Sequence, residues 1–152
     1  MTAKSNTRST ARLAAVQALF QHHMEKTPVP RLLKEFHDHR LGAEIEDAQY
    51  RPVEVDFFDD IVIGVSRNIG EIDQLIEEKL ASDWSMGRLD KTMLQILRAG
   101  AFELMERDEV PTGTVISEYV DVAHAFFNKK DSGFINGLLD AIAKQVRGEV
   151  KS

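Results

Sequence analysis

The sequence predicts an all-α protein with about seven helices, and three observations support this fold class. Apolar residues recur at spacings of three and four along most of the chain, which is the period of a helix with one buried face. Short β-branched runs such as residues 61–65 lie within that period, and no hairpin of alternating segments is found. At 152 residues, the chain is long enough to form a hydrophobic core.

The first third of the chain predicts two helices and a loop. The first helix is expected over residues 8–24, where the apolar residues share one stripe. A shorter helix is expected over residues 30–40, because Pro30 suits a first helical turn. Residues 41–52 are charged and bounded by Gly and Pro, which predicts a loop.

A third and a fourth helix are expected at residues 55–68 and 72–80, with a break near Gly70. Both helices have an apolar face and are interpreted as packing elements. Residues 81–89 lack helical periodicity and contain Trp84, the only tryptophan of the chain.

Three further helices complete the fold. The fifth is expected to end near residue 107, and Gly100 within it permits the close approach of another helix because it has no side chain. A sixth helix is followed by a turn at residues 128–133 and by a seventh helix. The candidate N-cap residues of the three helices are Asp90, Thr114 and either Asp131 or Ser132.

Composition excludes several classes of protein. The chain has no cysteine, which excludes disulfides, thiolate metal sites and cysteine nucleophiles, and is typical of a reducing compartment. No apolar run approaches the roughly 20 residues that span a bilayer, and residues 1–10 are polar. We therefore expect a cytoplasmic protein without a membrane segment.

Charge is distributed unevenly along the chain, although its formal net value is −6. Residues 1–24 contain no Asp or Glu, whereas Lys4, Arg8 and Arg12 supply three positive charges there. Arg8, Arg12 and Gln17 fall largely off the apolar stripe of the first helix. Two smaller basic groups occur at Lys129 and Lys130, and at Lys144, Arg147 and Lys151. A local positive surface is expected if the fold brings these groups together.

The patterns typical of enzymes are absent from the sequence. It contains no Gly-x-Ser-x-Gly elbow, phosphate-binding Gly-x-x-x-x-Gly-Lys loop or Gly-x-Gly-x-x-Gly turn. His37 and His39 are two residues apart and would point to different faces of a helix, so we expect no metal site. Adjacent carboxylates such as Asp59 and Asp60 also diverge and are interpreted as solvated. No catalytic residue, metal or cofactor is expected.

Basic and aromatic residues together favour RNA binding, because Arg and Lys contact phosphates while aromatic rings stack on unpaired bases. An alternative remains open for each group. Arg8 and Arg12 could lie on a solvated helix face, and Asp131 could serve only as an N-cap. The aromatic residues that could instead belong to the core are Phe20, Phe126, Phe127 and Phe134.

Several segments resemble the NusB transcription antitermination family. The resemblance covers nearly the whole chain in the same order, and the last motif is the most specific. The segments that carry it are ARLAAVQALF at 11–20, RLD at 88–90, ILRAGAFEL at 96–104, VP at 110–111, VISE at 115–118 and DSGFINGLLD at 131–140.

The resemblance implies a single domain, residues 1–152, made of two packed helical subdomains at roughly 8–80 and 81–148. It implies no catalytic activity and no cofactor. Members of the family bind the boxA element of ribosomal RNA leader transcripts together with NusE, a ribosomal protein. The pair helps RNA polymerase to resist termination, so the partners implied here are boxA-like single-stranded RNA, NusE and the antitermination complex of the polymerase.

Position by position, the resemblance also implies an RNA-binding surface. The arginine-rich N-terminus of the family matches Arg8 and Arg12, its aromatic residue in the first helix matches Phe20, and its entry to the last helix matches Asp131, Ser132 and Phe134. Gln17 lies on the first helix and Lys4 precedes it, while Lys129 and Lys130 come just before the last helix. The full RNA-binding prediction is Lys4, Arg8, Arg12, Gln17, Phe20, Lys129, Lys130, Asp131, Ser132 and Phe134.

The sequence departs from the family pattern at three places. Ser9 and Thr10 interrupt the arginine run, which should lower the affinity for phosphates. Phe20 stands where the family usually has a phenol, so stacking persists without a hydroxyl hydrogen bond. The segment from residue 131 to 134 is short and lacks a basic residue, for which Lys129 and Lys130 could substitute.

Three alternatives stay open at this point. A NusB-like module could act in ribosomal RNA processing or modification, since a similar domain occurs fused to an RNA methyltransferase. The basic first helix could instead contact an acidic protein partner and no RNA. A homodimer could bury the same basic surface. The preferred RNA sequence and the residues that contact the protein partner are not specified by these patterns.

Overall fold

The computed structural model describes residues 2–41, 52–81 and 84–148, with side chains at residues 8–38, 55–81 and 84–148. Within these residues the all-α prediction is confirmed, with seven α-helices and no strand. None of the described helices is long and apolar enough to cross a membrane. The helices are α1 (Thr2–Glu25), α2 (Val29–Glu35), α4 (Pro52–Arg67), α5 (Ile69–Lys79), α6 (Lys91–Glu106), α7 (Thr112–His124) and α8 (Lys129–Val146), with a π-helical segment, η1 (Phe36–Leu41), and a 3-10 turn, η2 (Met86–Arg88).

The chain forms two compact units, residues 1–66 and residues 67–152, and each is described by itself. The division of the chain lies between Ser66 and Arg67, at the end of α4, and the subdomain boundary near residue 80 stays a prediction. Residues 42–51 of the expected loop lie outside the described residues. The expected second helix is shorter than residues 30–40, because α2 gives way to the π-helical segment η1.

The first unit is built around aromatic side chains of η1 and α4. The rings of Phe36 and Phe58 stack with centroids 5.5 Å apart, and both residues are buried. His37 Nε2 lies 2.7 Å from Asp59 Oδ1, which links η1 to α4 a second time. Since each contact joins η1 to α4, the two elements are held together by both apolar and polar interactions.

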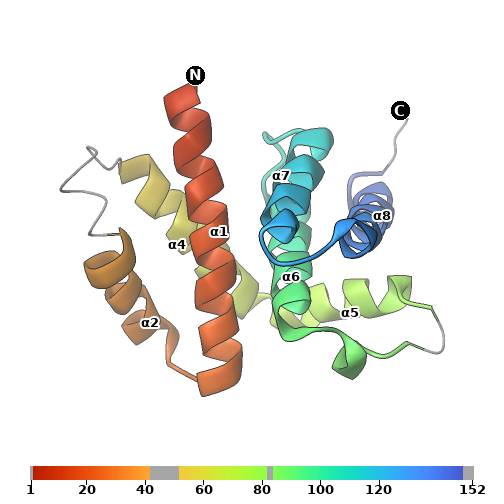
Figure 1. The fold of residues 1–152 in the computed structure, drawn as a ribbon, viewed down its shortest axis with the longest axis horizontal. Helices are drawn as coiled ribbons and strands as arrows, with labels where there is room; N and C mark the ends of the chain where they lie inside the picture. The colour runs from red at the N-terminus through yellow and green to blue at the C-terminus, as the bar shows by residue number, and fades with distance from the viewer. Residues whose placement is uncertain (1, 42–51, 82–83, 149–152) are drawn as a thin grey trace. The chain divides into compact units, whose positions relative to one another are not determined.

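Helix α6 forms the centre of the second unit. Every residue of Met93–Leu104 is buried, and the helix contacts α5, α7 and α8, which are grouped around it in Figure 1. A helix that is buried on all sides must find hydrogen-bond partners for its polar side chains. Gln95, Arg98 and Glu103 are the residues of α6 to which this requirement applies.

Arg98 and Glu103 find partners on neighbouring helices, whereas the oxygen of Gln95 accepts from Arg98 of the same helix at 3.3 Å. Arg98 of α6 donates from Nε and Nη2 to the two carboxylate oxygens of Asp73 on α5, both at 2.8 Å. This two-pronged geometry is stronger and more directional than a single contact. Tyr119 of α7 donates its hydroxyl hydrogen to Glu103 Oε2 at 2.6 Å, and both residues are fully buried. The register of α5 and α7 on α6 is therefore set by polar pairs as well as by apolar packing.

The expectation that Gly100 permits a close helix approach is confirmed. A Cβ atom built on this residue would lie 2.9 Å from Leu139 Cδ2 and 3.1 Å from Leu139 Cδ1. Such separations are shorter than ordinary van der Waals contact, so any side chain here would displace Leu139. Gly100 thus allows α8 to pack directly on α6.

The observed N-cap residues of α6 and α8 can be compared with the predicted ones. Asp90 caps α6 as expected, since its side chain accepts hydrogen bonds from the backbone N–H groups of Thr92 and Met93. The prediction that Asp131 or Ser132 caps the last helix is wrong. Asn128 caps α8, because its extended backbone aims its side-chain oxygen at the N–H of Asp131, 3.0 Å away.

Two other starts also differ from the prediction. Helix α7 begins at Thr112, directly after Pro111, and not at Thr114; the fixed φ of Pro111, −60°, directs the chain into the helix without a side-chain cap. The break before α5 is at Asn68, and Gly70 lies in the first turn of the helix.

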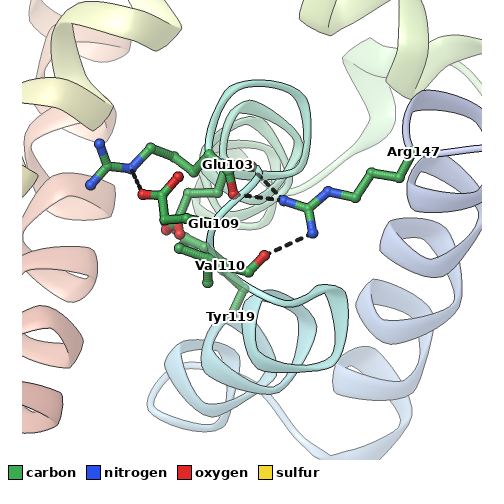
Figure 2. Close-up of polar contacts among 6 residues, drawn as sticks. Glu103, Glu109, Val110, Tyr119 and Arg147 are labelled. Atoms are coloured by element: carbon green, nitrogen blue, oxygen red, sulfur yellow. Dashed lines mark hydrogen bonds and ion pairs between the residues drawn. The ribbon is translucent and has the colours of Figure 1, made fainter.

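Arg147, just after the end of α8, holds the C-terminal end of α6. Its guanidinium is half-buried and extends from α8 towards Glu103 and Val110 in Figure 2. The carbonyl groups in the last turn of a helix have no partner within the helix, and a cation is favourable there. Arg147 donates to the backbone oxygens of Glu103 (3.3 Å), Leu104 (2.9 Å), Arg107 (2.8 Å) and Val110 (2.8 Å), and to Thr112 Oγ1 (3.1 Å).

We expect Arg147→Ala to lower the free energy of unfolding by about 3 kcal/mol, because several partly buried carbonyl groups lose a charged donor. Denaturant unfolding followed by circular dichroism measures this change. Lys144→Ala is the control: its ion pair with Asp140 is exposed, so a change below about 0.5 kcal/mol is expected. Equal effects of the two substitutions would contradict a special role of Arg147.

Candidate nucleic-acid interface

Arg8 and Arg12 of α1 are less exposed than the sequence suggested. Lys4 lies in the first turns of α1, outside the described side chains. The guanidinium carbons of Arg8 and Arg12 lie 4.4 Å and 4.9 Å from the ring centroid of Phe57 on α4. The expectation that Arg12 falls off the buried face is wrong, because this side chain is only 3% exposed. The cation–π contact with Phe57 helps to accommodate a charged group there.

Uncharged residues instead form an accessible line along α1, from residue 13 to residue 24. Gln17 is exposed, and Phe20 and Met24 are 37% and 52% exposed, although the apolar stripe in the sequence placed both inward. Leu13 is half-buried on the same face. The spacings of four, three and four from residue 13 to 24 put these side chains in one line along the helix. This line offers a ring, an amide and apolar contacts, but no charge.

The first turn of α8 carries exposed positive charge. Lys129 and Lys130 are both exposed, as an RNA-binding role requires. Asp131 is half-buried one residue later, near the positive end of the helix dipole. Ser132 is 3% exposed, and its hydroxyl donates to the backbone oxygen of Asn128 at 3.1 Å. Ser132 therefore supports the turn from inside, while the two lysines face solvent.

Phe134 has an aromatic partner that the sequence analysis missed. Its ring stacks on that of Trp84, with centroids 5.8 Å apart and an angle of 21° between the planes. Phe134 is half-buried and Trp84 is 45% exposed. The one available signal was a tryptophan in a segment without helical period, where no apolar stripe assigns it to the core.

The third basic group does not form a comparable surface. Arg147 is engaged with backbone carbonyls, as described above, and Lys144 pairs with Asp140 at 3.2 Å. Lys151 lies outside the described residues. Within the described part of the chain, no three His, Asp or Glu side chains gather as a metal site would require.

The predicted RNA-binding residues thus fall into two groups. One lies on α1 in the first unit and the other at the start of α8 in the second unit. Each group combines an aromatic ring with polar or basic side chains. Arg12 and Ser132 are the buried members, whereas Gln17, Phe20, Lys129 and Lys130 are directly accessible.

Comparison with known proteins gives one consistent family. Residues 9–144 match the model of the NusB family. A protein of Novosphingobium aromaticivorans, named transcription antitermination protein NusB, is 63% identical over 140 residues, which cover 92% of this chain and 95% of that protein. A protein of Sphingopyxis alaskensis with the same name is 60% identical over 147 residues, which cover 97% and 99% of the two chains.

The fold is also similar to solved structures. One is a chain from the crystal structure of the antitermination factors NusB and NusE in complex with double-stranded RNA. It superposes with a TM-score of 0.76 at 27% identity, over 92% of this chain and 98% of that chain. The likeness therefore extends over both units of the present protein.

Arg12→Met is expected to lower the free energy of unfolding by about 1 to 2 kcal/mol, because the buried cation–π contact with Phe57 is lost. Arg31→Met removes the same charge from a side chain that is 71% exposed, so a change below about 0.5 kcal/mol is expected. Thermal or urea unfolding of both variants measures the difference. A similar small effect for both would show that the contact with Phe57 contributes little.

Proposed function

The chain belongs to the NusB family, and on this basis we propose that it is a transcription antitermination factor. It acts by binding RNA together with a ribosomal protein of the NusE kind, not by catalysis. The observation that carries the proposal is the first turn of α8, where two exposed lysines stand beside a stacked aromatic pair. Such a combination is typical of proteins that hold unpaired nucleotides.

The RNA is proposed to be the single-stranded boxA element of ribosomal RNA leader transcripts. Exposed rings favour single strands, because the bases of a duplex are already stacked on one another. The protein would act in the cytoplasm as part of the antitermination complex of RNA polymerase. The solved relative with NusE and double-stranded RNA supports an RNA and a ribosomal protein as partners of the family fold.

The exposure of each side chain suggests its role in this proposal. Lys129 and Lys130 contact phosphates, since both are exposed at the start of a helix. Phe20 and Phe134 stack on bases, and Gln17 offers an amide to a base edge. The remaining candidates act near these contacts. Lys4 and Arg8 add positive charge on α1. Arg12 and Ser132 are buried and hold α1 and the first turn of α8 in place within the protein, and Asp131 restrains that turn.

A protein partner is expected to raise the RNA affinity. The charge that this chain offers is modest, because Arg12 is buried and Arg8 is half-buried against Phe57. Affinity for nucleic acid depends strongly on the number of phosphate contacts. A basic ribosomal protein that binds the same RNA would add such contacts without competing for the exposed rings.

We expect the double substitution Lys129→Ala and Lys130→Ala to weaken binding to a boxA-like oligonucleotide. The slope of log affinity against log salt should become shallower by about 1.4, since two contacts to a single strand are lost. The control is Lys34→Ala with Lys144→Ala, which removes the same charge from exposed positions elsewhere. Fluorescence anisotropy over a range of salt concentrations, with and without the ribosomal protein, measures both slopes.

The two sets of titrations also separate the alternatives. Equal affinity for boxA-like and scrambled RNA would argue against antitermination and for a general role in ribosomal RNA processing. No RNA binding, with or without the ribosomal protein, would favour a module that contacts only proteins. An unchanged slope in the Lys129 and Lys130 variant would remove these lysines from the interface.

A further inference from the structure

Trp84 is exposed to an extent that packing of the second unit does not explain. The residue is 45% exposed, while its ring stacks on that of Phe134. A large aromatic ring in a stable core would be covered by further apolar side chains. The stacked pair therefore presents an open apolar surface next to the first turn of α8.

One side of α8 beside the pair carries a lysine and two exposed glycines. Lys130 is four residues before Phe134 on α8, which puts the two Cβ atoms within about 6 Å of each other on one face. Gly133 and Gly137 lie on the same side of the helix and are exposed, with open space where a Cβ would be. A ligand backbone can therefore approach α8 closely beside the rings.

Resting on the function proposed above, we propose that Trp84 is an RNA-binding residue. One unpaired base stacks on its open face, so that Phe134, Trp84 and the base form a continuous stack. Lys130 contacts the adjoining phosphate, and the bare surface at Gly133 and Gly137 accommodates the sugar-phosphate backbone. We call Trp84, Phe134, Lys130, Gly133 and Gly137 the α8 platform.

Charge favours a nucleic acid over an apolar protein surface as the occupant. Lys129 and Lys130 are exposed beside the rings, whereas Asp131, the one acidic residue in that turn, is half-buried. The positive end of the helix dipole adds to the potential at this place. A purely apolar partner would leave the two ammonium groups without compensation at the edge of the contact.

Trp84 also allows a direct test, because it is the only tryptophan of the chain. A boxA-like single strand is titrated into the full-length protein, and its binding is followed by anisotropy of a label on the RNA. If a base stacks on the indole, tryptophan emission is quenched in parallel with the anisotropy change. A blunt duplex of the same sequence should produce much weaker quenching, since its bases are paired and stacked.

Substitutions extend this test. Trp84→Leu is expected to weaken binding about tenfold, in line with the loss of one stacked base, while Trp84→Phe keeps most of the affinity. Phe126→Leu is the matched control, because Phe126 is 44% exposed in the same unit and its ring pairs with Phe127 and not with Phe134. It should bind RNA within about twofold of the unchanged protein.

The outcomes separate this inference from the proposed function. If the protein binds no RNA, the proposed function itself fails. If it binds RNA and responds to the Lys129 and Lys130 substitutions, but tryptophan emission is unchanged and Trp84→Leu has full affinity, only the role of Trp84 is overturned. A Trp84→Leu variant that melts at lower temperature with full RNA affinity would assign the pair to stability alone. Emission from the unsubstituted protein decides the question even if Trp84→Leu does not fold.

Discussion

The complete burial of α6 over Met93–Leu104 is the constraint on which the second unit depends. Polar groups on such a helix cannot reach water, so each neighbouring element must supply a partner at a fixed position. Asp73 on α5, Tyr119 on α7 and Arg147 after α8 meet this requirement. Because α8 also packs on Gly100 through Leu139, its direction is fixed along its length. The exposed lysines and the ring of Phe134 are therefore carried on a helix whose position is determined far from them.

Much of the helical architecture could be predicted from the sequence, because a helix with one buried face repeats its apolar residues regularly. The ends of the helices were harder to predict, since a cap depends on backbone conformation as well as on side-chain type. Asp131, Ser132 and Asn128 all have side chains able to cap, and only the extended backbone of Asn128 selects it. Pro111 likewise starts α7 through its fixed backbone angle, although Thr114 has the better capping side chain.

The residues of the candidate site could be predicted only where the exposure of a side chain follows from the residues next to it in the sequence. Lys129 and Lys130 are accessible, as two adjacent lysines before an apolar helix suggest. Arg12 is buried because the ring that covers it, Phe57, comes from a helix that is distant in sequence. For the same reason the pairing of Trp84 with Phe134 is a tertiary contact with no local signal. Periodicity identifies an apolar stripe but not which of its edge residues, such as Phe20, stays in water.

The contacts of Arg147 bear on the order in which the chain folds as it is synthesised. A protein leaves the ribosome from its N-terminus, and its domains generally fold in that order. The first unit has all of its helices once residue 66 has emerged. The second unit needs the guanidinium of Arg147 to satisfy carbonyls at the end of α6, so its native hydrogen bonding is completed only after residue 147 has emerged. Until then the end of α6 remains hydrated, and the unit lacks the helix that carries the exposed lysines.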